Sequence, residues 1–131
     1  SIGFSLLDYN YDADFTASKQ VVNKMVRAIL NKKIDNNLLL NVNIPIATPE
    51  QLKGIKLCRQ ANAKYKEDFI ERIDPHQKKY FWLTGEFKNF DKGKDTDVWA
   101  LQNKYVSVVP VQFDLTHYKL KQKLEKSKLF Q

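Results

Sequence analysis

The chain has little of the material from which disulfides, zinc sites and membrane spans are built. Its 131 residues include one cysteine and two histidines. Cys58 therefore has no internal disulfide partner, and a zinc site, which needs about three or four protein ligands, has few candidates. No apolar run approaches the roughly 18 residues of a membrane-spanning helix, and no Asn-x-Ser/Thr acceptor occurs. These absences predict a cytoplasmic protein with no membrane partner.

The composition is that of an ordinary globular protein, 43% apolar and 28% charged. The formal charge of +7 would suit an anionic partner. Much of that excess lies near the C-terminus, where Leu120 and Leu124 stand one helical turn apart. The pattern predicts a final amphipathic helix with a narrow apolar stripe and a solvated basic face. The lysines concerned are Lys119, Lys121, Lys123, Lys126 and Lys128.

The first third of the chain predicts a strand, a helix and a second strand. Residues 2–7 form an unbroken apolar run, which is typical of a strand covered on both faces in a parallel sheet. Asp14 is the predicted N-cap of the helix, residues 35–37 form a turn, and residues 38–46 form the next strand. This order favours a parallel β-α-β unit. The residues at helical spacing are Phe15, Val22, Met25, Val26 and Ile29.

The middle of the chain predicts a short helix, a strand and a long hairpin. Residues 48–51 carry the hydroxyl, proline and glutamine that open a helix, and Gly54 ends it. Residues 55–60 then predict a strand. Residues 65–73 and 79–87 are extended, partly alternating runs joined by a five-residue loop, which is typical of a β-hairpin.

The segment after the hairpin predicts a loop, a short helix and a strand. Residues 90–95 are polar and are expected to be a mobile loop. Thr96 is the predicted cap of the helix that follows it. Residues 105–113 predict a strand, in which Pro110 indicates an edge or a bulge.

No segment carries a complete catalytic motif. Gly93-Lys94 is not a phosphate-binding loop, because Asp95 stands where Ser or Thr is needed and Lys88 stands where glycine is needed. Cys58 has no activating base nearby in the sequence and is predicted to be a buried, inert thiol.

The histidines and carboxylates favour structural roles. His76 lies in the predicted hairpin turn, and His117 is expected to hold a strand-to-helix corner through a hydrogen bond. Asp8 follows a predicted parallel strand and is the best-placed carboxylate for Mg²⁺ or Mn²⁺, but a single carboxylate is a poor metal site. The remaining acidic pairs are predicted to be surface or capping residues; they are Asp12 with Asp14, Glu67 with Asp68, and Asp95 with Asp97.

The predicted hairpin mixes aromatic and basic residues, and two interpretations remain open. Aromatics beside cations can stack on single-stranded nucleic acid. Alternatively, they pack against another subunit, which we favour because a two-stranded hairpin is barely stable alone. The residues predicted to make oligomer contacts are Phe69, Tyr80, Phe81, Trp82, Leu120 and Leu124.

Several segments, in this order and spacing, resemble the survival protein SurE family. The resemblance runs from Ser1 to His117 and implies an α/β fold, specifically the C-terminal part of a Rossmann-type three-layer fold with a projecting hairpin and a C-terminal helix. Residues 1–60 would complete the core, 61–95 would form the hairpin and loop, and 96–131 would form an oligomerisation segment. The most specific segments are residues 40–45, 67–75, 80–86, 96–97 and 105–111.

The resemblance also implies an activity. Members of this family are expected to be phosphatases that use Mg²⁺ or Mn²⁺ to release phosphate from nucleoside 5′- or 3′-monophosphates, in dimers or tetramers that exchange C-terminal elements. No position here matches the family's catalytic or metal ligands, so none is assigned. Thr96 and Asp97 match a motif expected near the substrate.

Because the chain opens directly on an apolar strand, it is expected to be the C-terminal half of such a nucleotidase and inactive alone. The alternative is a self-sufficient basic module that binds single-stranded nucleic acid, not a duplex.

Overall fold

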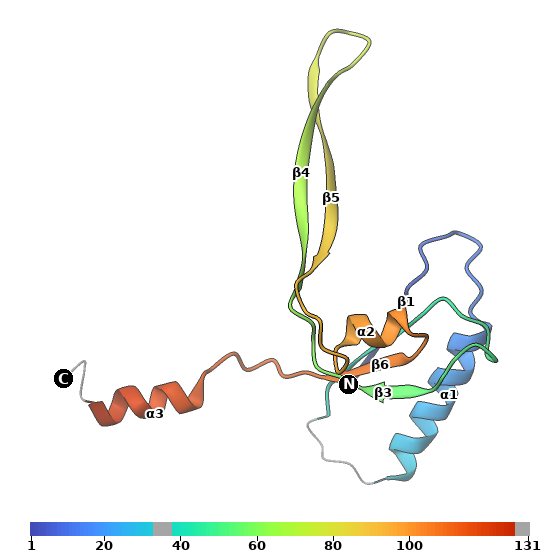
Figure 1. The fold of residues 1–131 in the computed structure, drawn as a ribbon, viewed down its shortest axis with the longest axis vertical. Coiled ribbons are helices and arrows are strands. Elements are labelled where there is room, and N and C mark those ends of the chain that lie inside the picture. The colour runs from blue at the N-terminus through green and yellow to red at the C-terminus, as the bar shows by residue number, and fades with distance from the viewer. Residues whose placement is uncertain (33–37, 128–131) are drawn as a thin grey trace.

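A four-stranded mixed sheet forms the centre of the computed structural model, which describes residues 1–32 and 38–127 (Figure 1). The spatial order of its strands is β1 (Ile2–Leu6), β2 (Leu40–Ile44), β6 (Val106–Pro110) and β3 (Ile55–Leu57). β1 runs parallel to β2, β6 runs antiparallel to β2, and β3 runs parallel to β6. The two outer strands, β1 and β3, are therefore the edges of this sheet.

The main core lies between one face of the sheet and α1 (Thr16–Asn31). In β2 the apolar residues alternate with asparagines, so that Val42 and Ile44, which are 0% and 1% exposed, point toward the helix. Val21 and Met25 of α1 pack in the same cluster. Because Ile44 is almost fully enclosed, truncating it to alanine would cost about 2–5 kcal/mol.

A second, smaller cluster covers the opposite face. There α2 (Asp97–Gln102) contributes Ala100, which is buried with Cys58 and Val109. Figure 1 shows α1 and α2 on different sides of the strands. The three predicted layers, helix, sheet and helix, are therefore confirmed.

The hairpin projects away from these layers (Figure 1). Its strands, β4 (Ala63–Ile73) and β5 (Lys79–Asn89), pair antiparallel along their whole length and form a separate two-stranded sheet. Asp74 holds the turn, because its carboxylate accepts hydrogen bonds from the backbone N–H groups of His76 and Lys78, both at 2.8 Å. The predicted hairpin is confirmed, and both of its faces are largely exposed.

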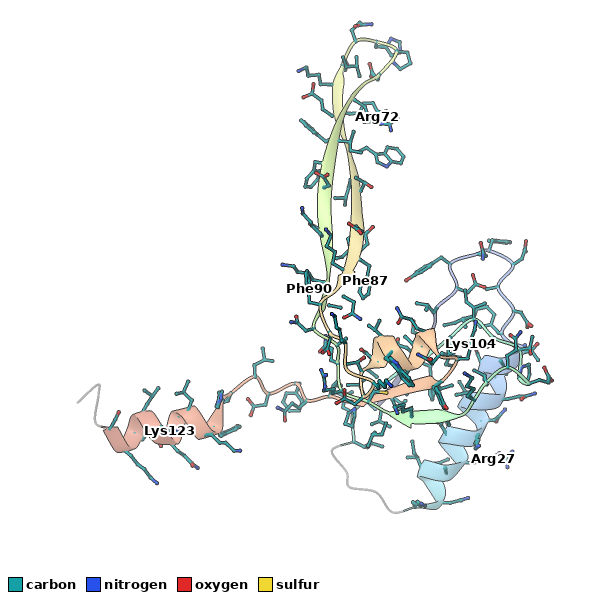
Figure 2. All side chains as sticks on the ribbon, in the orientation of Figure 1. Arg27, Arg72, Phe87, Phe90, Lys104 and Lys123 are labelled. Carbon is teal, nitrogen blue, oxygen red and sulfur yellow. The ribbon has the colours of Figure 1, made fainter. Side chains whose placement is uncertain are left out.

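The C-terminal helix, α3 (Tyr118–Ser127), extends from the core in another direction (Figures 1 and 2). It has no buried residue, and Leu120 is 47% exposed. The predicted amphipathic helix is confirmed for the described residues, with its apolar stripe uncovered. Within residues 1–32 and 38–127, no helix is long and apolar enough to cross a membrane.

Several expectations for the first half were wrong. The N-cap residue of α1 is Phe15, not Asp14. Asp14 lies one residue before the N-cap, and its carboxylate accepts the Thr16 N–H at 2.8 Å. Phe15 is 51% exposed and does not join the core. β1 is an edge strand covered on one face only, with Gly3 and Ser5 exposed. The predicted turn at residues 35–37 lies outside the described residues.

Other corrections concern the ends of strands. Residues 48–51 form a turn rather than a helix, in which Thr48 O accepts the N–H groups of Gln51 and Leu52 at 3.1 and 3.2 Å. Gly54 follows with a φ of 126°, a conformation that favours glycine. β3 ends at Leu57, short of the predicted residue 60. Pro110 does not mark an edge, because it is the last residue of β6, which is a central strand. Proline has no N–H to donate, but at this position the pairing with β2 does not need one. The next residue, Val111, continues that pairing by donating its N–H to Leu39 O at 3.0 Å.

Candidate functional site

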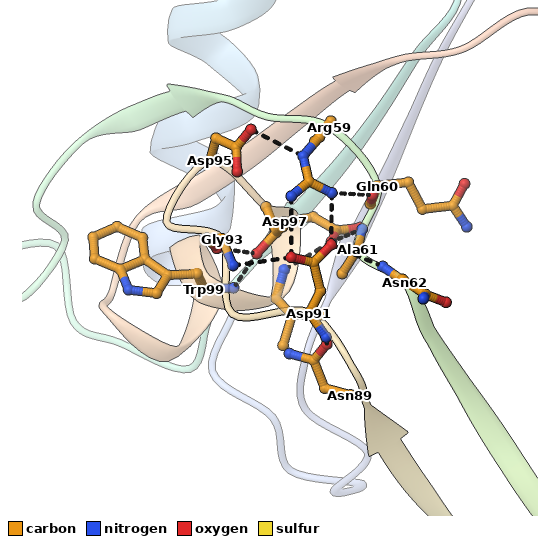
Figure 3. Close-up of polar contacts among 12 residues, drawn as sticks. Arg59, Gln60, Ala61, Asn62, Asn89, Asp91, Gly93, Asp95, Asp97 and Trp99 are labelled. Carbon is orange, nitrogen blue, oxygen red and sulfur yellow. Dashed lines mark hydrogen bonds and ion pairs between the residues drawn. The ribbon is translucent and has the colours of Figure 1, made fainter.

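One arginine joins the hairpin to the α/β core. Arg59 donates to both carboxylate oxygens of Asp91, at 2.6 and 3.0 Å, and its Nε donates to Asp95 at 2.9 Å (Figure 3). Such two-pronged arginine–carboxylate contacts fix orientation as well as distance. The Asp91 side chain is only 13% exposed, and the guanidinium of Arg59 holds the pKa of its carboxyl well below the usual range. We call these three residues the hairpin joint.

The hairpin joint contacts the segment expected to be mobile. The carboxylate of Asp91 also accepts the backbone N–H groups of Gly93, at 2.9 Å, and Asn62, at 3.2 Å. It therefore binds both the residue that precedes β4 and the loop that follows β5. Residues 90–95 form the predicted loop, and this network holds it against the residues that precede β4; its mobility stays a prediction.

Thr96 and Asp97, the residues expected near the substrate, lie directly beside the hairpin joint. Thr96 is 0% exposed; its hydroxyl donates to Gly93 O at 2.9 Å and accepts the Trp99 N–H at 3.2 Å. The predicted N-cap is therefore confirmed. One oxygen of Asp97 accepts the N–H groups of Ala61 and Val98, at 2.9 and 2.8 Å. Their contacts tie α2 to the segment that precedes β4 and to the loop that follows β5. Their proximity to substrate stays a prediction.

Replacing Thr96 with valine should destabilise the fold by about 1–3 kcal/mol, because the helix loses its cap and the partly buried carbonyl of Gly93 loses its donor. Urea unfolding followed by circular dichroism measures the loss. Thr96→Ser keeps the hydroxyl and should recover most of the stability. Equal stability of Thr96→Val and the unchanged chain would contradict the capping role.

A cavity of about 540 Å³ opens between α2 and the base of the hairpin. One wall is the exposed side of α2, at Val98 and Leu101. The second is the start of the hairpin, and the third is the segment that follows β1, beginning at Leu7. The cavity is thus bounded by three parts of the chain that are far apart in sequence.

The residues predicted to make oligomer contacts are uncovered in the single chain. Phe69 and Phe81 are 62% and 63% exposed, and the strand register places them on one face of the hairpin. Tyr80 and Trp82, 41% and 59% exposed, lie on the other face near the tip. Both faces of the distal hairpin therefore present aromatic side chains, together with Leu120 and Leu124 on α3.

The remaining candidates have structural partners. Asp8 accepts hydrogen bonds from the backbone and side chain of Asn10, at 3.0 and 2.7 Å. His117 accepts the Leu120 N–H at 3.1 Å, which confirms the predicted corner, and His76 is exposed in the hairpin turn. Cys58 is buried as predicted, just past the end of β3, and burial raises the pKa of its thiol. In the described part of the chain, no three His, Cys, Asp or Glu side chains form a metal-binding group.

Comparison with known proteins gives one consistent family. The family profile described as "Survival protein SurE" matches residues 1–67. The protein named 5′-nucleotidase SurE from Flavobacterium psychrophilum is 56% identical over 116 residues, which are 88% of this chain and 45% of the relative. The protein of the same name from Flavobacterium johnsoniae is 50% identical over 129 residues, which are 98% of this chain and 50% of that relative.

A solved structure agrees with the sequence comparison. The crystal structure of the SurE protein from Aquifex aeolicus superposes with a TM-score of 0.75 at 36% identity, over 97% of this chain and 51% of that one. The chain therefore spans about half the length of the curated relatives it matches.

Proposed function

This chain belongs to the survival protein SurE family, and from that premise we propose that the protein carrying it is a phosphohydrolase that releases phosphate from nucleoside monophosphates. The observation that carries the proposal is the combined match of sequence and fold, along nearly the whole chain, to relatives named 5′-nucleotidase SurE. The proposed substrates are the 5′- and 3′-monophosphates, and the proposed cofactor is Mg²⁺ or Mn²⁺.

Within that protein, the proposed role of this chain is structural support. It contributes four strands to the sheet and carries the hairpin and the C-terminal helix. The described residues do not fit a metal centre, since they contain no cluster of three or more His, Cys, Asp or Glu side chains. We therefore assign the metal ligands to the rest of the protein and derive no catalytic step from this chain.

Phosphate release tests both parts of this proposal. The protein that carries this chain, assayed with AMP and Mn²⁺, should turn over, whereas the 131-residue chain alone should give only the background of a no-protein control. Turnover by the chain alone would refute its proposed inactivity. No turnover by the longer protein, across the four common nucleoside monophosphates, would refute the proposed activity.

We also propose that the aromatic hairpin and α3 are contact surfaces between subunits, by exchange of C-terminal elements in a dimer or tetramer. Large exposed aromatics on a thin hairpin are typical anchors of protein interfaces. Changing Phe69 and Phe81 together to serine should shift the sedimentation coefficient toward the monomer. Glu71→Gln, on the same hairpin face, is the matched control and should leave the assembly unchanged. If the double variant has the same sedimentation coefficient as the control, this face is not an interface.

On the hairpin face that carries Phe69 and Phe81, the charges favour assembly over single-stranded nucleic-acid binding. That face carries Glu67 and Glu71, and its one lysine, Lys79, is paired with Glu71 at 2.9 Å. A groove that stacks bases needs cations beside the aromatics to hold the phosphates. Binding of an oligonucleotide that falls steeply as salt rises would reverse this preference.

A further inference from the structure

We propose that the cavity of about 540 Å³ between α2 and the base of the hairpin binds the nucleobase of the substrate. This inference rests on the proposed function, since it assigns one part of a nucleoside monophosphate to a place in this chain. The size is suitable, because small-molecule pockets in proteins have volumes of about 300–1,000 Å³.

The position of the cavity in the fold favours a ligand site. Leu7 and Tyr9, which line it, come directly after β1, at the carboxyl end of a strand that pairs parallel to β2. In open α/β sheets, ligands bind in the crevice outside the carboxyl ends of the strands. The hairpin base and α2 line the same space from two other sides, so the cavity is an open pocket between three segments rather than a flat apolar surface.

Two aromatic side chains at the hairpin base supply walls on which a flat base can stack. Tyr65 and Phe87 are directly opposite each other in the strand register and therefore lie on the same hairpin face. Both remain more than half exposed, at 59% and 55%, which leaves ring surface open to the cavity. Figure 2 shows Phe87 where the hairpin meets the core. Stacking on an aromatic ring contributes about 1–3 kcal/mol per base, which is roughly a 5- to 150-fold effect on binding.

These walls are fixed before any ligand arrives. The hydroxyl of Tyr65 donates to Gly85 O at 3.0 Å, so the ring is held across the strand pair. The opposite wall, α2, is positioned by the Thr96 cap and by the Asp97 contact to Ala61. A pre-formed cavity binds a rigid ligand at a lower entropy cost than a surface that must first order itself.

One polar side chain in the cavity distinguishes a base from a purely apolar ligand. Gln102 lines the cavity, one turn beyond Val98 on α2. Its amide carries both a donor and an acceptor group, as the hydrogen-bonding edge of every nucleobase does. We therefore assign Gln102 to recognition of the base edge, and the apolar residues beside it to the ring faces.

A binding experiment tests this assignment without using the phosphatase reaction. The full-length protein that carries this chain is titrated calorimetrically with adenosine, guanosine, cytidine and uridine, and with ribose as the base-free probe. At least one nucleoside should bind, and ribose should not. Phe87→Ala, which removes a wall, and Val98→Trp, which fills the cavity, should each weaken nucleoside binding roughly tenfold or more.

Two further variants sharpen the result. Phe15→Ala removes a phenylalanine that is similarly exposed, 51% against 55% for Phe87, but lies outside both the cavity and the proposed subunit contacts, and it should leave the nucleoside affinity unchanged. Gln102→Ala should change the order of preference among the four nucleosides. Absence of binding by all four, as expected if another segment of the protein fills the cavity, overturns the proposal. Unchanged affinity in both cavity variants overturns it as well.

A kinetic comparison separates this inference from the proposed function. Phosphate release is measured with AMP and with ribose 5-phosphate, which lacks the base. Phe87→Ala should lower kcat/KM for AMP roughly tenfold or more and change that for ribose 5-phosphate less than about twofold. Equal losses on both substrates overturn the base site alone. If neither substrate is hydrolysed by the unchanged protein, the proposed function fails, and the nucleoside titration still decides the cavity assignment.

Discussion

Replacing Arg59 with alanine is expected to release the hairpin from the α/β core while the sheet and α1 stay folded. The change removes every side-chain contact that Arg59 makes with Asp91 and Asp95. It also leaves the Asp91 carboxylate, only 13% exposed, without its cation, which costs far more than losing an exposed ion pair. Amide hydrogen exchange at Asn62 and Gly93 should accelerate about tenfold or more, because local opening of this segment becomes easier.

Arg72→Ala is the matched control for this prediction. Arg72 lies on the exposed part of the hairpin, and no ion pair of its side chain occurs among the described residues. Its removal should leave exchange at Asn62 and Gly93 unchanged. Equal exchange in the Arg59 and Arg72 variants would show that backbone contacts alone hold the hairpin.

The pH dependence of exchange gives an independent measure of the same contact. The pKa of Asp91 is lowered in the folded state, first of all by its hydrogen bonds to Arg59, whereas an unfolded aspartate has a pKa of about 3.9. The stability that this carboxylate contributes is thus fully present above about pH 4 and is lost as the pH falls through its folded value. The protection of the Gly93 amide, taken relative to the intrinsic exchange rate at each pH, should fall in acid more in the unchanged protein than in Arg59→Ala.

The elements predicted correctly were those whose signals are local in the sequence. Thr96 caps α2 because its hydroxyl reaches a backbone N–H three residues away, so the sequence around it contains the whole interaction. The hairpin likewise follows from two neighbouring extended runs and one turn. The predicted N-cap of α1, Asp14, lies one residue before the actual N-cap. The prediction was wrong because hydroxyl and carboxylate side chains near the start of a helix can accept backbone N–H groups from more than one position.

The hairpin joint was missed because its members are distant in the sequence. Arg59 lies 32 residues from Asp91 and 36 from Asp95, and nothing near Arg59 distinguishes it from other exposed basic residues. The cavity was missed for the same reason, since its walls come from three separate segments. Likewise, the central position of β6, and hence the harmless Pro110, depends on a sheet order that no local pattern specifies.

Replacing Gly85 with alanine should strongly disturb the base of the hairpin. A Cβ at this position would overlap the ring of Tyr65 and lie 2.7 Å from the backbone oxygen of Lys66. A side chain can turn aside, but the strand backbone has to shift, and such overpacking costs typically about 1–3 kcal/mol. Amide exchange along β4 and β5 measures the loss. Gly3→Ala is the control, because its Cβ would meet nothing closer than Leu40 O at 3.9 Å, and it should be nearly neutral.

Removing the Tyr65 ring separates the two clashes at Gly85. If the ring carries part of the cost, Gly85→Ala combined with Tyr65→Ala should be more stable than the sum of the single changes predicts, by about 0.5 kcal/mol or more. Some cost must remain, because Lys66 O stays in place. Strict additivity would mean that the ring moves away freely. In that case Tyr65 would not be the fixed wall that base stacking in the cavity requires. The double-mutant cycle of unfolding free energies therefore also tests the proposed base site.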